Sequence, residues 1–552
     1  MGDPTLLSER IASKSNYFPS DPIAEAVSVP QIDSIRAMYK VHKYWARKPW
    51  YVVNRYIQHF TREGETVLDP FCGSGVAGME AIANGRKAVL VDLNPIAAFI
   101  TKNTARVDIN LNTLDQTFED IRKKCEKEIR DLYSLDEKCP NCKSNLEMRH
   151  LLRGPKFHEW IVYGMCPQCL NGKQYVRRPL KKSEVRRLKK IEGRKISYWY
   201  PQNAFPEKFD KNRITYKGIK YIHQIFTTRN LYALAVLWDH IMKVTDEPTR
   251  DLLKLSFSNS LLHVSKLKAE NVRPMAVNNY WVPDDWIEEN VWFRFNERFN
   301  LLRKGKEVAI KRINQESHGN LKVYNASALK LSMLSNNSVD YIFTDPPYGD
   351  SIQYTELSMI WNAWLGTMPS NKEEAVINPT QSKGVDEYGL LLEGSFKEMF
   401  RVLKYGRWIS VCFHNKEFKV WNAILQACKN AGFVLVNAVP QEPISQSFNQ
   451  SWSKYSTKTD MIINLIKPFP EDKSFLYEKF GRNGGIKMRE IITEVLEKKD
   501  SSALKITDLY DRVLMKIMRE SFFSEKFLDQ DAFSIYKIDE ILSEFNIRRL
   551  IK

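Results

Sequence analysis

Three groups of residues in this chain of 552 residues have types and spacings that suit chemistry. The first is an Asp-Pro-Pro-Tyr motif at residues 345–348, which follows an apolar run. The second is a glycine-rich turn at residues 69–78, with Asp92 beyond it. The third consists of two Cys-x-x-Cys pairs, at residues 139–142 and 166–169. Each group needs a scaffold that holds it next to residues far away in the sequence.

The Asp-Pro-Pro-Tyr motif supplies the hydrogen-bond acceptors that transfer of a group to an amine requires. An exocyclic amine of a base is a poor nucleophile, because its lone pair is delocalised into the ring. The Asp345 carboxylate and the Pro346 carbonyl can each accept one N–H, which stabilises the positive charge that develops on the nitrogen. Proline keeps the turn rigid, and Tyr348 offers a flat face on which an extruded base can stack. The predicted catalytic residues are Asp345, Pro346, Pro347 and Tyr348.

The glycine-rich turn is typical of a cofactor site at the start of a doubly wound α/β sheet. Residues 66–105 read as strand, turn, helix, strand, acidic turn and helix. Glycines in such a turn let the backbone approach a ligand, and the acidic residue binds ribose hydroxyls. Asp69 favours S-adenosylmethionine, since a carboxylate there would neutralise an ammonium group but repel a pyrophosphate. The cofactor-binding residues predicted in this segment are Asp69, Phe71, Gly73, Gly75, Asp92 and Asn94.

Both motifs resemble those of the amino-methyltransferase family of DNA modification enzymes, the DPPY-type N6-adenine and N4-cytosine methyltransferases. The glycine-rich segment is similar to the family's motif I and Asp92 to its acidic motif II. The order of cofactor motif, long insertion and catalytic motif is similar to the family's alpha arrangement. The resemblance implies a Rossmann-like sheet of the α/β class, S-adenosylmethionine as the cofactor, and double-stranded DNA as the partner. It also implies base flipping and direct methyl transfer.

The resemblance adds cofactor residues outside the glycine-rich segment. Residues 42–49 look like the segment that in this family folds over the methionine moiety, which implicates Tyr44. Arg47 and Lys48 are alternative partners for the cofactor carboxylate. Ser327 stands near the expected adenine ring, where the family often has an acidic residue, so this position departs from the family pattern.

The cysteine pairs predict a structural metal site. Cys139, Cys142, Cys166 and Cys169 are spaced as in a zinc ribbon, and four thiolates close a tetrahedral Zn²⁺ site with no position left for a substrate. A run of Lys and Arg at residues 177–195 follows, and then the aromatic residues 198–200. Cations that follow phosphates beside aromatic rings that can stack predict a DNA-contacting surface.

The bulk composition agrees with a nucleic-acid partner. The formal net charge is +17 at pH 7 and the pI is near 9.2, an excess that suits a polyanion. No run approaches the ~18 apolar residues of a membrane span, and the first residues do not read as a secretory signal. We expect a cytoplasmic protein.

Changes of pattern predict five parts of the chain. They are an N-terminal arm (1–34), the first part of a methyltransferase domain (35–108), an inserted target-recognition region with a zinc ribbon at 139–169 (109–320), the second part of the methyltransferase domain (321–468) and a C-terminal helical domain (469–552).

Other functions stay open at this point. N4-cytosine methylation uses the same geometry, although that group more often has serine at the position of Asp345, so the carboxylate favours adenine N6. RNA guanine-N2 methyltransferases have a similar motif, but no RNA-binding module is recognisable here. Intact motifs argue against a catalytically silent DNA-binding subunit. A restriction nuclease or an anti-phage defence subunit is an open choice of partner, which the sequence does not decide.

Overall fold

The computed structural model describes most of the chain up to residue 472. The described residues are 18–19, 21–30, 35–155, 160–169, 174–208, 214, 217–275, 280–313, 319–415, 417–441 and 460–472. Most of the predicted N-terminal arm and nearly all of the predicted C-terminal helical domain lie outside them. Among the described helices, none combines the length and the apolar character that crossing a bilayer requires.

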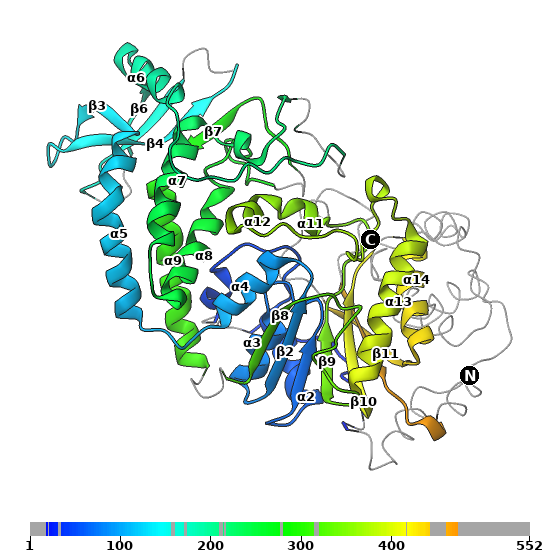
Figure 1. The fold of residues 1–552 in the computed structure, drawn as a ribbon. Helices are drawn as coiled ribbons and strands as arrows, with labels where there is room; N and C mark the ends of the chain where they lie inside the picture. Colours follow the sequence, from blue (N-terminus) through cyan, green and yellow to red (C-terminus); the bar gives the residue numbers. More distant parts are fainter. Residues whose placement is uncertain are drawn as a thin grey trace, which may run out of the picture.

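A seven-stranded sheet forms the larger layer of the molecule (Figure 1). Its strands are, in spatial order, β11 (Val434–Gln441), β12 (Asp460–Ile466), β10 (Leu403–Phe413), β9 (Val339–Thr344), β1 (Thr66–Asp69), β2 (Lys87–Asp92) and β8 (Leu321–Asn325). The five strands from β10 to β8 are parallel, whereas β12 is antiparallel to both of its neighbours. Strand β9 is buried at every residue, as expected for a parallel strand that is covered on both faces.

Helices pack their apolar side chains against this sheet and form the first of two cores. They are α2 (Trp50–Phe60), α3 (Val76–Ala83), α13 (Val385–Val402) and α14 (Phe418–Ala431). Helix α3 approaches β2 very closely, because a Cβ on Gly78 would lie 2.3 Å from Cδ1 of Leu90. Packing of α3 against β2 therefore requires glycine at position 78, whether or not a ligand binds.

Strand β1 stands at the point where the direction of the chain through the sheet reverses. After β1, the chain adds β2 and β8 on one side and β9 and β10 on the other. In an open α/β sheet, ligands bind at such a switch point, outside the carboxyl ends of the strands. Asp69 ends β1, Asp92 ends β2, and Asp345 directly follows β9. The topology thus brings three acidic residues to one edge of the sheet.

The chain between β2 and β8 builds a second body (Figure 1). Its helices are α4 (Pro95–Ala105), α5 (Leu111–Asp131), α6 (Lys182–Glu192), η3 (Ile222–Ile225), α7 (Thr228–Met242), α8 (Glu247–Leu261) and α9 (Val291–Arg312). Its strands are β3 (Ser134–Lys138), β4 (Asn145–Arg153), β5 (Ile161–Met165), β6 (Gln174–Pro179) and β7 (Trp286–Glu289). They form a second sheet in the order β3-β4-β5-β6, with β7 also paired to β4.

The second core joins this body to the catalytic motif. It contains side chains of α4, α5, α7, α8 and α9, together with Val41 and Trp45 from the segment before α2. Two short helices that follow the Asp-Pro-Pro-Tyr motif, α11 (Tyr354–Leu357) and α12 (Met359–Leu365), also belong to it, and Trp361 and Trp364 of α12 are fully buried there. The segment before α2 and the helices that follow the Asp-Pro-Pro-Tyr motif are therefore both anchored in the second core.

The expected α/β class is confirmed in its coarse form, as a mixed α/β fold with a parallel-rich sheet that a long insertion interrupts. Strands β8 to β12 all lie within residues 321–468, the range predicted as the second part of the methyltransferase domain.

Candidate functional site

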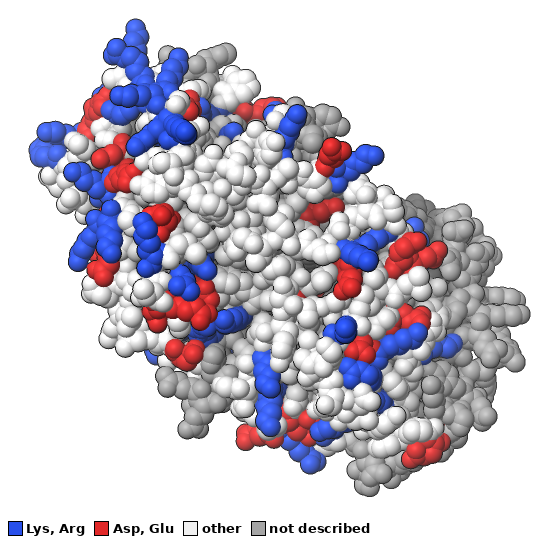
Figure 2. All heavy atoms as spheres, in the orientation of Figure 1, with Lys and Arg blue, Asp and Glu red and all other residues white. Residues whose placement is uncertain are grey.

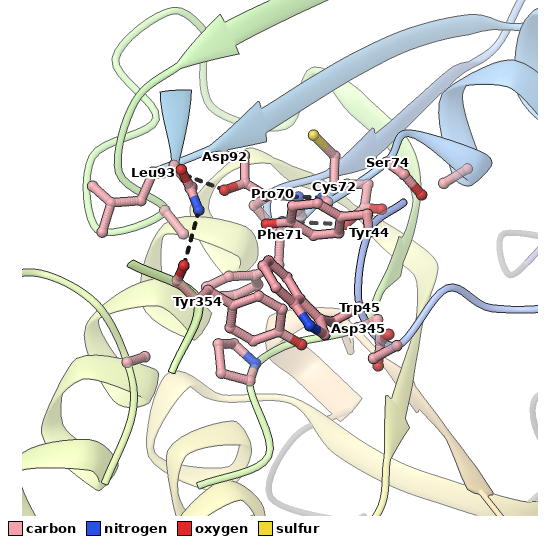
Figure 3. A pocket seen from close by; sticks show the side chains of 18 of the residues that line it. Tyr44, Trp45, Pro70, Phe71, Cys72, Ser74, Asp92, Leu93, Asp345 and Tyr354 are labelled. Atoms are coloured by element: carbon pink, nitrogen blue, oxygen red, sulfur yellow. Dashed lines mark hydrogen bonds between the residues drawn. The ribbon is translucent and has the colours of Figure 1, made fainter. Parts of the chain in front are cut away.

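A cavity lies at the carboxyl ends of β1, β2 and β9 (Figure 3). Many of the residues that the sequence predicts as site residues line it. They are Tyr44, Arg47, Lys48, Asp69, Phe71, Gly73, Asp92, Asn94, Ser327, Asp345 and Pro347. Three other predicted residues of the described chain, Gly75, Pro346 and Tyr348, are not part of this lining.

Asp92 fixes the glycine-rich turn. Its Oδ2 accepts a hydrogen bond from the Gly73 amide at 2.8 Å, and its Oδ1 accepts one from the Asn94 amide at 2.8 Å. Gly73 has a φ of +50°, and a Cβ there would lie 3.0 Å from the Tyr44 ring. The position therefore favours glycine. Burial raises the pKa of Asp92 to about 6, although both amides oppose the shift.

Asp69 is a buried carboxyl group at the end of β1. The Thr344 hydroxyl donates to its Oδ1 at 2.9 Å, and the Phe71 amide donates to the same oxygen at 3.2 Å. Burial nevertheless raises the pKa of Asp69 to about 8. A cation that enters the cavity would favour the charged form of this carboxyl group.

Aromatic rings form one wall of the cavity. Tyr44 and Tyr354 are stacked, with ring centroids 5.9 Å apart, and Trp45 lies 5.0 Å from Trp361. In Figure 3, the side chains of Asp92 and Asp345 lie on opposite sides of these rings. Nε1 of Trp45 is buried and has no hydrogen-bond partner among the described residues.

Asp345 is held by two groups on one of its oxygens. The Tyr348 hydroxyl donates to Oδ1, and Nζ of Lys48 lies 3.5 Å from the same atom. No hydrogen bond from the described part of the chain reaches Oδ2. Burial raises the pKa of Asp345 to about 6, although Lys48 and Tyr348 lower it in part. Oδ2 is thus the atom that can accept a hydrogen bond from a substrate amine.

Lys48 is a partner of the Asp345 carboxylate in this structure. Its Nζ also lies 2.7 Å from Oδ2 of Asp460, at the start of β12. Burial disfavours its charge, but Asp345 and Asp460 raise the pKa of Lys48 above its ordinary value. Arg47, the other predicted partner for a cofactor carboxylate, donates to Ser74 Oγ at 3.0 Å and to two backbone carbonyls. Both cations are therefore engaged by protein groups.

Tyr348 has a different environment from the one its predicted stacking role requires. Its ring makes a T-shaped contact with Phe413, with centroids 5.2 Å apart, and its hydroxyl accepts a hydrogen bond from Nζ of Lys48. Stacking of a base on Tyr348 stays a prediction. Tyr354 is an aromatic residue that does line the cavity.

Glu374 is a site residue that the sequence did not reveal. Its Oε1 accepts the Thr355 amide at 2.8 Å, and Oε2 is buried without a hydrogen-bond partner among the described residues. Burial raises its pKa to about 7. The local sequence, NKEEAV, reads as a solvated charged turn, and Asp460 is 412 residues away from its partner Lys48, so neither had a local signal.

The charges of the cavity fit S-adenosylmethionine. Burial keeps the pKa of three lining carboxyl groups, those of Asp69, Asp92 and Glu374, above the ordinary range. Glu374 in addition has one oxygen without a partner in the described chain. The positive sulfonium and ammonium groups of a ligand would stabilise the ionised form of these carboxyl groups, whereas a pyrophosphate would be repelled by them.

The four predicted zinc ligands come together at one end of the second sheet. Their sulfur atoms all lie within 4.8 Å of one another. Sγ of Cys139 is 3.7 Å from that of Cys169, and Sγ of Cys142 is 3.4 Å from that of Cys166. Zn–S bonds of ~2.3 Å in a tetrahedron place sulfurs at similar separations. The group could hold a zinc ion.

The basic run lies on β6 and α6. Figure 2 shows Lys and Arg side chains gathered over this part of the molecule. Some of these cations form ion pairs, such as Arg187 with Asp136. Others, among them Arg186, Lys189 and Lys190, are exposed on α6.

The aromatic residues after the basic run connect this surface to the helices that follow the catalytic motif. Trp199 is 53% exposed, yet its ring lies 5.9 Å from that of Trp364 in α12. Tyr198 is partly buried against Tyr232 of α7. Of these aromatic side chains, Trp199 is thus the one most available to a partner.

Comparison with known proteins agrees with this geometry. Residues 13–103 match the sequence model of a family described as DNA methylase. This range contains the glycine-rich turn, Asp92 and the segment with Tyr44, Arg47 and Lys48. None of the curated proteins matches the chain. This match supports membership of the N6-adenine and N4-cytosine DNA methyltransferase family.

Proposed function

We propose that this protein transfers the methyl group of S-adenosylmethionine to the N6 amino group of adenine in DNA. The observation that carries the proposal is the position of Asp345 in the lining of a cavity rich in acidic groups, with one carboxylate oxygen that receives no hydrogen bond from the described residues. The family match supports a DNA methyltransferase in general. The preference for adenine rests on the carboxylate, since the N4-cytosine group more often has serine at this position.

The cofactor would bind at the edge where β1 and β2 end. When bound, it supplies an electrophilic methyl group. Asp92 would bind ribose hydroxyls and Asp69 would neutralise the ammonium group; Tyr44 and Ser327, which also line the cavity, would contact the cofactor as well. Because the pKa of Asp69 is about 8, we expect this carboxyl group to lose its proton as the ammonium group binds.

The target amine would meet Asp345 on its free oxygen. Oδ2 can accept one N–H, and the Pro346 carbonyl, which follows at once in the chain, can accept the other. Lys48 and Tyr348 position the carboxylate through Oδ1, so the acceptor does not have to reorient when the amine arrives. An aromatic ring such as that of Tyr354 can stack on the extruded base, at ~1 to 3 kcal/mol per stack.

DNA would approach over the surface that carries α6. Exposed cations on this helix can contact phosphates, and the exposed ring of Trp199 stands between them and α12. This surface is separate from the cavity. Such an arrangement agrees with DNA binding in which phosphate contacts position the protein on the duplex and a pocket binds the flipped base.

The modified base in host DNA tests the proposal. DNA from cells that express the protein should contain N6-methyladenine, measured by mass spectrometry after nuclease digestion. Asp345→Asn keeps the shape of the side chain but removes the charge, so the amount should fall at least ~100-fold.

Other products would identify the alternatives. N4-methylcytosine in place of N6-methyladenine would contradict the adenine assignment and leave the family membership intact. N2-methylguanine in RNA with unchanged DNA would contradict the proposal as a whole.

The pH dependence of methyl transfer should report the protonation state of the Asp345 carboxyl group. Only the ionised carboxylate accepts the N–H of the amine, and burial raises its pKa to about 6. At saturating cofactor, the rate should therefore rise between about pH 5 and about pH 7. In Lys48→Met, the cation that lowers this pKa is lost, so the acid limb should move to higher pH.

The matched control is Lys102→Met, which removes an exposed cation that does not line the cavity. Its pH profile should equal that of the wild type. A profile that is flat down to pH ~5, or identical in Lys48→Met, would show that Asp345 does not titrate in the reaction.

We further propose a structural zinc ion at Cys139, Cys142, Cys166 and Cys169. Elemental analysis of the purified protein should find about one zinc per chain. The double variant Cys142→Ser/Cys166→Ser should lose the metal and melt at a lower temperature, because metal binding contributes to folding. Cys125→Ala, which removes a buried thiol of α5 outside the cluster, should retain the zinc. Equal zinc content in both variants would exclude this site.

A further inference from the structure

A second cavity lies on the second sheet and shares no residue with the cavity that Asp345 lines. Two strands, a loop and α9 supply its polar side chains, together with Glu289 of β7. These side chains are Arg149, His150, Tyr163, Lys268, Glu289 and Arg294.

A row of residues across four strands forms its floor. The strand register pairs Glu289 with His150, His150 with Tyr163, and Tyr163 with Arg177. Residues paired in this way point to one face of a sheet, while the neighbouring Leu151 belongs to the second core on the other face. The rings of His150 and Tyr163 are stacked, with centroids 4.2 Å apart. The Arg177 guanidinium donates to the Tyr163 hydroxyl at 2.7 Å.

Cations exceed carboxylates around this floor. Lys268 and Arg294 both contact Glu289, and Arg294 also pairs with Glu297 one turn further along α9. Arg149 adds a further positive charge from β4, and Arg177 stands at the end of the row. Among these described residues, two carboxylates (Glu289 and Glu297) therefore face four cations.

The pKa values of two lining groups reflect this excess. Burial, together with Lys268 and Arg149, lowers the pKa of His150 to about 4. Burial, together with Arg294, lowers the pKa of Lys268 to about 8. An anion bound among these groups would stabilise their charged forms.

We infer that this cavity binds the phosphate group of a nucleotide, through Arg149, Lys268 and Arg294, with the stacked His150 and Tyr163 as the surface for its sugar or base. Charge-assisted contacts from Arg and Lys are the usual partners of phosphate. The cavity volume is about 180 Å³, more than ten times the ~10–15 Å³ that one water molecule needs. It therefore has room for more than a trapped water.

The nucleotide can belong to a DNA strand or be free in solution, because the phosphate chemistry is the same. If it belongs to DNA, the inference rests on the proposed function and places part of the DNA path on the second sheet. Titration of the full-length protein with a labelled DNA duplex and, separately, with adenosine monophosphate distinguishes the two sources.

The test compares Arg149→Gln and the double variant Arg149→Gln/Lys268→Met with the wild type. The control is Lys397→Gln, which removes an exposed cation of α13. For a DNA source, affinity for the duplex should fall about tenfold or more, and the slope of log K against log salt should shrink by ~0.9 for each removed cation. For a free nucleotide, adenosine monophosphate should bind the wild type and not the variants, with duplex affinity unchanged.

The melting temperature and S-adenosylmethionine binding of each variant show whether it is correctly folded. If the double variant does not fold, Arg149→Gln carries the test, since Arg149 is only partly buried and its loss leaves the contacts of Lys268 in place. Unchanged duplex affinity together with no binding of the mononucleotide, or an equal loss in Lys397→Gln, would overturn the inference. Methylated DNA from the same protein would show that the proposed function survives that outcome.

Discussion

The site depends on one constraint, the meeting of three parallel strand ends at the switch point of the sheet. Asp69, Asp92 and Asp345 come from segments up to 276 positions apart in sequence, yet β1, β2 and β9 are adjacent or next to adjacent in the sheet. Burial at this edge raises the pKa of each carboxyl group. Like charges gathered in a poorly solvated place are costly without a cation, so the fold itself defines a site for a positively charged ligand.

Contacts from distant segments hold the Asp345 carboxylate at this edge. Lys48, from the segment before the first strand, bridges Asp345 and Asp460, which begins the antiparallel strand β12. The same segment reaches into the second core through Trp45, and the catalytic motif reaches into it through α12. The insertion is thus packed against both sides of the cavity, which links the body that carries the basic surface to the geometry of the site.

Much of this arrangement could be predicted from local patterns. The glycine spacing, the acids at strand ends and the cysteine pairs each carry their signal within a few residues, so the cavity lining around Asp69, Asp92 and Asp345 was expected. Asp460 and Glu374 were not, because their roles depend on strand β12 and on a loop that only the folded chain brings to the cavity. Which of Arg47 and Lys48 would pair with a cofactor carboxylate stays a prediction, since both cations contact protein groups in the structure.

The most direct test is methyl transfer from labelled S-adenosylmethionine to DNA by purified wild type and Asp345→Asn, with cofactor affinity measured on the same samples. Both proteins should bind the cofactor with similar affinity, while transfer by the variant should fall at least ~100-fold. Equal transfer by the two proteins would contradict the assignment of Asp345. A failure of both proteins to bind the cofactor would contradict the assignment of the cavity.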